Sequence, residues 1–317
     1  MSTSAAAHHY GASVVASAEK IVSTTIASKA VSPASVTRVL YHGSNCPDGF
    51  ASAFVARLRL GASAQYVAME HGALPPPLAG ETAVVVDYCF KSDVTARLLS
   101  ETEGRFLVLD HHASAEKELA AVPDAHKVFV MAQSGATLSW NFFHDGTPVP
   151  LWLRYVEDKD IWRWALRDSE AFTAGFATVP QTWDAFDALH AGGDAAVAAL
   201  IAKGASILEY RNGVVESHVR RAVPVVMKAA PSLRASIVNT STLSSEIGNA
   251  ICKSGAADFA MLWFYDHVKS EFYVSLRSVD GDRADVSEIA RIFGGGGHKC
   301  AAGFSFKGAS ILELLAP

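Results

Sequence analysis

Residues 37–146 alternate between two patterns of apolar and polar positions. Short, largely apolar runs that predict buried strands occupy 37–42, 65–70, 81–88, 104–112 and 127–132. Helical patterns lie between or after them at 49–61, 92–104 and 134–146, and the first two end at a glycine. Strands that alternate with helices favour a mainly parallel sheet covered by helices on both faces. The pattern therefore predicts an α/β fold.

The pattern changes in the second half of the chain. Residues 151–220 are mostly helical, and a second alternation of strand and helix patterns follows. We place a domain boundary near residue 212, which gives a first domain at 37–212, ending in a helical linker, and a smaller α/β domain at 213–317. Residues 1–36 are rich in Ala, Ser and Thr, and we expect a disordered tail or an organelle transit segment there.

Composition narrows the possible functions. The 317 residues are 50% hydrophobic and carry a net charge of -5, so the chain can form sizeable cores but lacks the global basic field that grips long nucleic acids. Four cysteines without CxxC spacing fit a reducing compartment. We expect the cytoplasm, or a mitochondrion or plastid if the N-terminal segment is a transit peptide. No apolar run approaches the roughly 18–20 residues that span a bilayer, so no membrane partner is expected.

Ionisable residues follow the predicted strands of the first domain. They stand at the strand ends or shortly beyond them: His42, Asp48, Asp87, Asp110, His111 and His112. Three acidic residues, Glu157, Asp158 and Asp160, follow later between apolar positions. The carboxyl ends of parallel strands share one edge of the sheet, where ligands bind. One such residue alone is ordinarily a helix cap or a core histidine, but the combination favours a shared site.

Several carboxylates in one crevice repel one another, and burial penalises each charge. A divalent cation, or two cations bridged by one carboxylate, removes this conflict. Mixed Asp and His ligands suit Mn²⁺ or related ions better than they suit Ca²⁺, which takes oxygen ligands. Because paired metals of this kind commonly serve phosphoryl transfer, the residues predict a metal-dependent enzyme of that type.

Four segments, HGSNCPDG, VVVDY, VLDHH and YVEDKDIW, resemble in this order the motifs of the DHH phosphoesterase superfamily. The segment GGGGHKCAAGF at 294–304, with YVSLRS at 273–278 before it, resembles the DHHA1 substrate-binding domain. The chain length suits the nanoRNase and phosphoadenosine-phosphate phosphatase types rather than the longer RecJ nucleases. The resemblance implies two α/β domains, an active site in the cleft between them, and Mn²⁺-dependent phosphoester hydrolysis.

The resemblance also implies a set of metal ligands. His42 and Asp87 match ligands of one cation, while Asp48, Asp87 and His111 match ligands of the other, so that Asp87 bridges the two. We expect two Mn²⁺ ions, with Mg²⁺ or Co²⁺ as substitutes. The family usually has an aspartate four residues after the first histidine, where this chain has Cys46. A thiolate is a softer donor, so Cys46 either ligates and retunes this site or is a small buried filler.

The last ligand falls within YVEDKDIW. We assign it to Asp158, because Trp162 then stands where the family often has an aromatic residue, and keep Asp160 as the alternative. Asp110 matches a group that orients its neighbouring histidine. His112 matches the catalytic residue that faces the scissile phosphate.

In the second domain the resemblance points to a substrate-binding site. Consecutive glycines let backbone N–H groups approach an anion closely. Gly295, Gly296 and Gly297, followed by His298, therefore form a candidate phosphate cradle, although such a run can also be a flexible loop. Arg277 can bind phosphate oxygens through two parallel hydrogen bonds.

The resemblance leads to a specific expectation of activity. We expect hydrolysis of short single-stranded oligonucleotides, dinucleotides or 3′-phosphorylated nucleotides to mononucleotides by metal-activated water, as in a 3′–5′ exonuclease or oligoribonuclease. The alternatives are an exopolyphosphatase and a non-catalytic nucleotide-binding protein that lost a ligand at Cys46. Relatives of this size are often homodimers.

Overall fold

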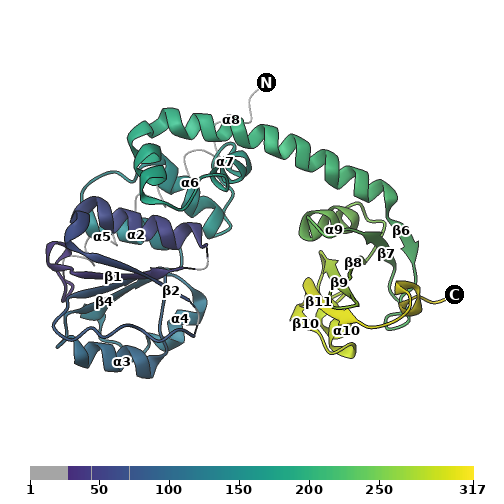
Figure 1. Cartoon of the computed structure of the whole chain (residues 1–317), viewed down its shortest axis with the longest axis horizontal. Coiled ribbons are helices and arrows are strands. Elements are labelled where there is room, and N and C mark those ends of the chain that lie inside the picture. Colours follow the sequence, from purple (N-terminus) through teal and green to yellow (C-terminus); the bar gives the residue numbers. More distant parts are fainter. Residues whose placement is uncertain (1–27, 44, 71) are drawn as a thin grey trace. The chain divides into compact units, whose positions relative to one another are not determined.

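The computed structural model describes residues 28–43, 45–70 and 72–317 (Figure 1). The chain divides into two compact units, Met1–Ile207 and Leu208–Pro317. The division falls inside the long helix α8 (Trp183–Arg221), which also contains the boundary expected near residue 212.

The first unit contains a five-stranded sheet in the order β2-β1-β3-β4-β5. All neighbouring strands are parallel, as predicted. The strands are β1 (Arg38–His42), β2 (Gln65–Met69), β3 (Ala83–Val86), β4 (Phe106–Asp110) and β5 (Lys127–Phe129). Strands β3 and β4 are buried along their whole length because they lie in the middle of the sheet. Strand β5 is shorter than predicted and ends at Phe129.

Helices cover both faces of this sheet (Figure 1). Val84 and Val86 point to one face, where they join a core formed with α2, α5, α6, α7 and α8. Val85 points to the other face and joins a separate core with α3 and α4. The helices are α2 (Pro47–Leu60), α3 (Ser92–Glu101), α4 (Ala113–Glu118), α5 (Gly135–Phe143), α6 (Leu151–Asp160) and α7 (Ser169–Phe176). The predicted α/β layering is therefore confirmed.

The end of the segment expected to be a tail belongs to the first unit. Val31 and Val36 are buried in the core beneath α2, and the turn η1 (Pro33–Ser35) lies between them. Ala30 donates a backbone hydrogen bond to Ala125 at 2.8 Å. Residues 28–36 are thus part of the fold, while the rest of that segment lies outside the described residues.

Helix α8 is interrupted at Gly193, whose φ of 51° and ψ of -139° are not helical. The middle of the helix, after this interruption, packs tightly on α7 through glycines. A Cβ added at Gly204 would lie 1.7 Å from the carbonyl oxygen of Ala171, and one at Gly175 would lie 2.0 Å from that of Leu200. By length and composition alone α8 could also cross a membrane, with a hydropathy of 1.3 over its most apolar window, so the absence of a membrane partner stays a prediction.

The second unit contains a six-stranded sheet in the order β10-β11-β9-β8-β7-β6. Only β7 and β8 are parallel neighbours. The strands are β6 (Val223–Val225), β7 (Ala235–Asn239), β8 (Phe259–Asp266), β9 (Glu271–Ser278), β10 (Gly296–His298) and β11 (Ala301–Phe306). Helix α9 (Ser244–Lys253) packs on the face that carries Leu262, and α10 (Val286–Ile292) packs on the face that carries Met261. This is the predicted second α/β domain.

Candidate metal centre

Side chains able to bind a metal gather beyond the carboxyl ends of β1, β3 and β4. Among the described residues, three groups have possible ligand atoms within 4.8 Å of one another. The groups are Asp87 with Asp110, His111 and His112; His42 with Cys46 and Asp87; and Asp48 with His111 and Asp160. Asp87 and His111 each occur in two groups, so the three form one continuous cluster at the sheet edge where the sequence predicts a site.

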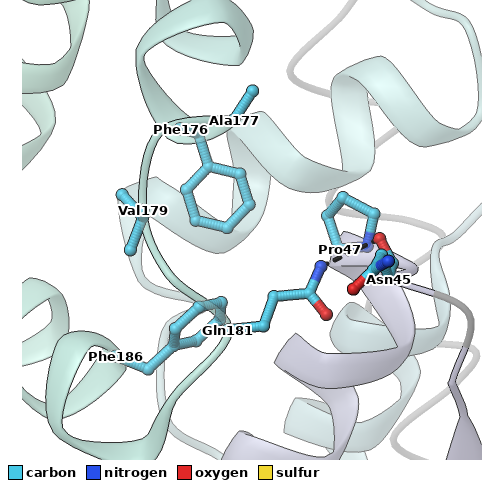
Figure 2. A pocket seen from close by; sticks show the side chains of 7 residues that line it. All are labelled: Asn45, Pro47, Phe176, Ala177, Val179, Gln181 and Phe186. Atoms are coloured by element: carbon cyan, nitrogen blue, oxygen red, sulfur yellow. Dashed lines mark hydrogen bonds between the residues drawn. The ribbon is translucent and has the colours of Figure 1, made fainter.

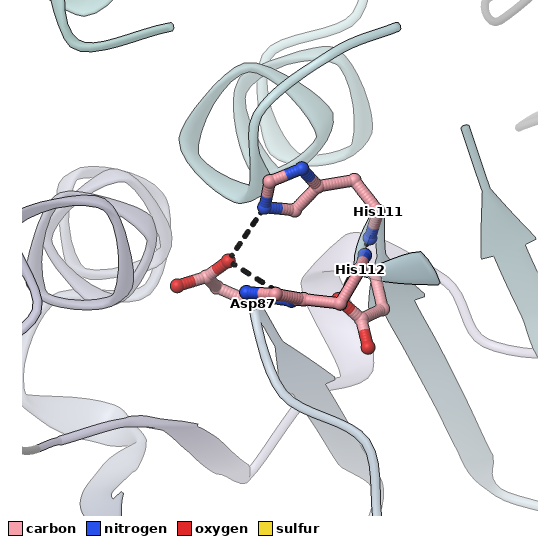
Figure 3. A group of neighbouring side chains, drawn as sticks. Asp87, His111 and His112 are labelled. Atoms are coloured by element: carbon pink, nitrogen blue, oxygen red, sulfur yellow. Dashed lines mark hydrogen bonds and ion pairs between the residues drawn. The ribbon is translucent and has the colours of Figure 1, made fainter. Parts of the chain in front are cut away.

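Asp87 belongs to two of these groups, and Figure 3 shows its side chain beside those of His111 and His112. Its Oδ1 lies 3.1 Å from Nε2 of His111, and its Oδ2 lies 3.5 Å from Nδ1 of His42 and 3.5 Å from Sγ of Cys46. Burial raises the pKa of Asp87, but hydrogen bonds with His111 and His42 outweigh it and hold the pKa below its usual range. The two oxygens of this carboxylate thus face different partners, and each could ligate a cation.

Asp87 has an uncommon backbone conformation and is closely packed. Asp87 follows β3 with a φ of 54°, a left-handed conformation that is uncommon for residues other than glycine. Gly135, the first residue of α5, packs directly against it. A Cβ at Gly135 would lie 2.4 Å from Cβ of Asp87 and 2.7 Å from its Oδ1, so only glycine leaves room for the carboxylate.

Asp48 is buried at the start of α2 and is held by the amino end of α5. Its Oδ2 accepts a hydrogen bond from Gly135 N at 2.7 Å, and its Oδ1 accepts one from Ala136 N at 3.0 Å. The same Oδ2 lies 3.6 Å from Nε2 of His111. Burial, followed by the charges of Asp87 and Asp160, raises the pKa of Asp48 well above its usual value. A bound cation would relieve this cost, because it compensates the carboxylate charge.

Asp110 organises the two histidines that follow it. Its Oδ1 accepts hydrogen bonds from His111 N at 2.7 Å, His112 N at 3.2 Å and His112 Nδ1 at 2.7 Å. Asp110 Oδ2 is buried without a hydrogen-bond partner among the described residues. The hydrogen bond with Asp110 raises the pKa of His112 to about 9, although burial opposes it. His112 is 41% exposed and His111 only 8%, so His112 can reach a ligand in solvent.

Asp158 and Asp160 take opposite positions on α6. Asp160 Oδ2 lies 3.3 Å from Nε2 of His111, inside the cluster. Asp158 points away, and its two carboxylate oxygens accept the backbone N–H groups of Ala165 at 2.9 Å and Leu166 at 3.1 Å. The structure therefore brings the alternative residue, Asp160, to the cluster in place of Asp158, whose oxygens are used to hold the next turn.

Cys46 lies within reach of the cluster but is also the N-cap of α2. Its sulfur accepts a hydrogen bond from Gly49 N at 3.4 Å. Burial, followed by the charge of Asp87, raises the pKa of the Cys46 thiol to about 12. The thiol is thus protonated near neutral pH when no cation is present.

The donor set fits divalent metals. Four carboxylates and three imidazoles converge, and two of the carboxyl groups, on Asp48 and Asp160, have pKa values that burial raises. Oxygen with imidazole nitrogen suits Mn²⁺, Mg²⁺ and related ions. His42, Asp48, Asp87, His111 and Asp160 would hold such ions, with Cys46 beside them.

A separate pocket of about 350 Å³ opens near the amino end of α2 (Figure 2). Its lining residues are Asn45, Pro47, Phe176, Ala177, Val179, Gln181 and Phe186. Gln181 Nε2 donates a hydrogen bond to the carbonyl oxygen of Asn45 at 2.9 Å. None of the candidate metal ligands lines this pocket.

The predicted substrate-binding residues of the second unit lie on neighbouring strands. Ala301 of β11 pairs with Arg277 on one side and with His298 on the other, so these two side chains flank it on one face of the sheet. Gly296 and Gly297 belong to the edge strand β10, while Gly295 directly precedes it. A Cβ at Gly295 would lie 2.2 Å from the carbonyl oxygen of Gly303, which explains why that position lacks a side chain.

Arg277 is held at the amino end of α9. Its Nε and Nη2 lie 3.4 Å and 3.3 Å from the hydroxyl of Ser245, to which they donate. Gly248 leaves the space for this side chain, because a Cβ there would lie 2.6 Å from Cβ of Arg277. The assignment of phosphate binding to Arg277, Gly295, Gly296, Gly297 and His298 stays a prediction.

No family model matches the sequence. The uncharacterized protein R106 of Acanthamoeba polyphaga mimivirus is 30% identical over 293 residues, which cover 85% of this chain and 67% of the viral protein. The chain belongs to the same family as this viral protein. Because the viral protein is uncharacterized, this relationship does not indicate an activity.

The pGpG-specific phosphodiesterase PggH from Vibrio cholerae shares the fold. It has a TM-score of 0.52 at 12% identity, over 86% of this chain and 93% of PggH. RecJ from Thermus thermophilus, solved in complex with Mg²⁺, gives a TM-score of 0.41 at 15% identity over 92% of this chain and 49% of RecJ. This chain therefore shares with PggH a fold that has, in chain order, a parallel-sheet domain, a long helix and a mixed-sheet domain.

The sequence motifs did not reveal what holds Asp48. The backbone N–H groups of Gly135 and Ala136 hold it, and neither residue has a polar side chain that would mark it as part of a site. The available signal was Ser134 followed by Gly135 at the start of a predicted helix, because helix amino ends bind anions.

Proposed function

We propose that the chain is a Mn²⁺-dependent phosphoesterase that hydrolyses short oligonucleotides, dinucleotides or 3′-phosphorylated nucleotides to mononucleotides. The observation that carries the proposal is the Asp87-centred cluster on a DHH fold, with separate partners on each oxygen of Asp87. The similarity of fold to a phosphodiesterase that acts on pGpG supports a dinucleotide-sized substrate.

The residues of the cluster have separate roles in this proposal. When bound, the cations act as Lewis acids that lower the pKa of a water molecule and stabilise charge on the phosphoryl oxygens. His42, Asp48, Asp87, His111 and Asp160 hold them, and Asp160 replaces Asp158 in this role.

The remaining groups position the substrate. Asp110 accepts the Nδ1 proton of His112, which leaves Nε2 of that ring for the scissile phosphate. The raised pKa of His112, caused first by this hydrogen bond, keeps the ring cationic near neutral pH and therefore suited to an anion. Arg277 and His298 bind a phosphate of the substrate in the second domain.

The test uses protein stripped of metal with a chelator and resupplied with Mn²⁺. Release of mononucleotide from pApA is followed beside release of phosphate from polyphosphate, with Asp87→Ala as the control. We expect mononucleotide release in the wild type and none in the variant. Phosphate from polyphosphate alone would instead identify an exopolyphosphatase. Metal binding without turnover of either compound would contradict the proposed hydrolysis.

A further inference from the structure

Two tryptophans follow the candidate ligand Asp160. Trp162 is 74% exposed, which is unusual for so large an apolar side chain. Its ring contacts that of Trp164 edge to face, with 5.1 Å between the centroids and 81° between the planes. Trp164 is half-buried and therefore supports the exposed ring from one side.

The backbone at both tryptophans is strained. Their φ angles are 59° at Trp162 and 51° at Trp164, in the left-handed region that bulky residues rarely adopt. Such strain costs free energy and persists only where the surroundings enforce it. Strained positions of this kind concentrate at sites that bind or react with ligands.

Asp158 enforces this conformation. Its carbonyl oxygen accepts hydrogen bonds from Arg163 N at 2.8 Å and Trp164 N at 3.2 Å. Its carboxylate accepts those from Ala165 N and Leu166 N. One buried residue thus satisfies four consecutive backbone N–H groups and fixes the turn that presents Trp162. This gives Asp158 a role apart from metal binding.

We propose that Trp162 is a stacking platform for a nucleobase of the substrate, and that Asp158 is its positioning residue. Trp162 stands two peptide units from Asp160, so their Cα atoms are at most about 7.6 Å apart. A phosphate at the cluster therefore brings the attached nucleoside near the indole ring. Aromatic rings stack on any base, so the platform would bind substrates without strong sequence preference.

The neighbours of Trp162 favour a nucleotide over an apolar protein surface as the occupant. The ring follows Asp160, which belongs to the candidate metal cluster, and basic Lys159 precedes that residue. Arg163 and the exposed Arg167 are in the same segment, each with an ion pair: Arg163 Nη1 lies 3.3 Å from Oε1 of Glu157, and Arg167 Nε lies 3.3 Å from Oδ2 of Asp168. An exposed indole ring beside a candidate metal site matches a ligand that combines aromatic bases with phosphates.

The inference rests on the proposed function, and binding measurements separate the two. The probes are a phosphorothioate-linked pApA, which resists hydrolysis, and two analogues that each lack one base. Calorimetry in Mn²⁺ gives the Kd of each probe for the wild type, Trp162→Ala and Trp162→Phe. Tyr210→Ala, which removes a ring that is 78% exposed on α8, is the matched control.

We expect Trp162→Ala to raise the Kd of the full probe by about 5- to 140-fold, the range of base–aromatic stacking. Removing one particular base should weaken wild-type binding by a similar factor and should not weaken Trp162→Ala further. Trp162→Phe should retain most of the affinity, and Tyr210→Ala all of it. Asp158→Asn should lie between the wild type and Trp162→Ala, because it loosens the turn but keeps the ring.

Equal affinity of the wild type and Trp162→Ala for the full probe would overturn the platform, as would an absence of binding to the wild type. If pApA is hydrolysed and Trp162→Ala changes neither Kd nor KM, the platform fails while the proposed function stands. If base-dependent binding at Trp162 occurs without turnover of pApA, the platform stands and the proposed hydrolysis fails.

Discussion

The contrast between Asp158 and Asp160 gives a sharp test of the site. Asp158 is 1% exposed, and both of its oxygens accept backbone hydrogen bonds. An asparagine keeps one acceptor oxygen but turns its NH₂ group toward the other N–H group. Hydrogen bonds to a charged group contribute about 1.5–3 kcal/mol each. Asp158→Asn should therefore lower the free energy of unfolding by about 1.5–3 kcal/mol.

Asp160→Asn should have the opposite profile. It removes one carboxylate from a cluster of four, and burial already raises the pKa of Asp160. The metal-free protein should therefore lose less than about 1 kcal/mol of stability. Changes to groups that only support a ligand weaken metal binding about 10- to 100-fold. Loss of a direct ligand should raise the Kd for Mn²⁺ by at least 10-fold.

Both quantities can be measured on the same preparations. Urea unfolding in a chelator gives the free energy of unfolding, and titration followed by the electron paramagnetic resonance signal of free Mn²⁺ gives the Kd. Asp158→Asn should change mainly the first and Asp160→Asn mainly the second. If Asp158→Asn weakens Mn²⁺ binding more than Asp160→Asn does, the assignment of the ligand is wrong.

Two further predictions concern other parts of the chain. Hydrogen bonds from Arg234 hold the pKa of the Asp258 carboxyl well below its usual range. This stabilisation of the folded state is present above the unfolded pKa of about 3.9 and is lost as pH falls toward the folded pKa. Asp258→Asn should therefore lower the free energy of unfolding by about 1.5–3 kcal/mol at pH 7 and by progressively less below about pH 4. Urea unfolding across pH checks this, and a cost that is the same at pH 3 and pH 7 would refute it. In the metal-free protein, the Cys46 thiol, with a pKa near 12, should react with a disulfide reagent at pH 8 about 10³-fold more slowly than an unperturbed thiol. Labelling of the intact chain followed by peptide mass spectrometry measures this rate, and labelling of Cys46 as fast as a free thiol would show that burial does not control it.

Much of the fold and cluster could be predicted because the signals are local. The apolar run that ends in Asp110 predicts a buried strand with ionisable residues at its carboxyl end, and β4 ends at that residue. The parallel arrangement then brings His42, Asp87 and His111 together, since carboxyl ends of parallel strands share an edge. Each of these residues lies in the cluster.

The choice between Asp158 and Asp160 could not be made this way. Residues two apart on a helix of 3.6 residues per turn point about 200° apart, so only one of them can face the cluster. Which one does depends on how α6 rotates against α5 and the sheet, a tertiary property that spacing does not encode. The left-handed turn at Trp162 could not be predicted either, because it depends on hydrogen bonds from the following backbone N–H groups to the carbonyl and carboxylate oxygens of Asp158.

The central claim is that the cluster around Asp87 binds the cations that act on the substrate. The most direct measurement is the number of Mn²⁺ ions bound per chain, by equilibrium dialysis of the wild type and Asp87→Asn with matched pApA assays. The account predicts two Mn²⁺ ions per wild-type chain, with binding and turnover both lost in the variant. Equal Mn²⁺ binding by the two proteins, or turnover that survives in Asp87→Asn, would contradict it.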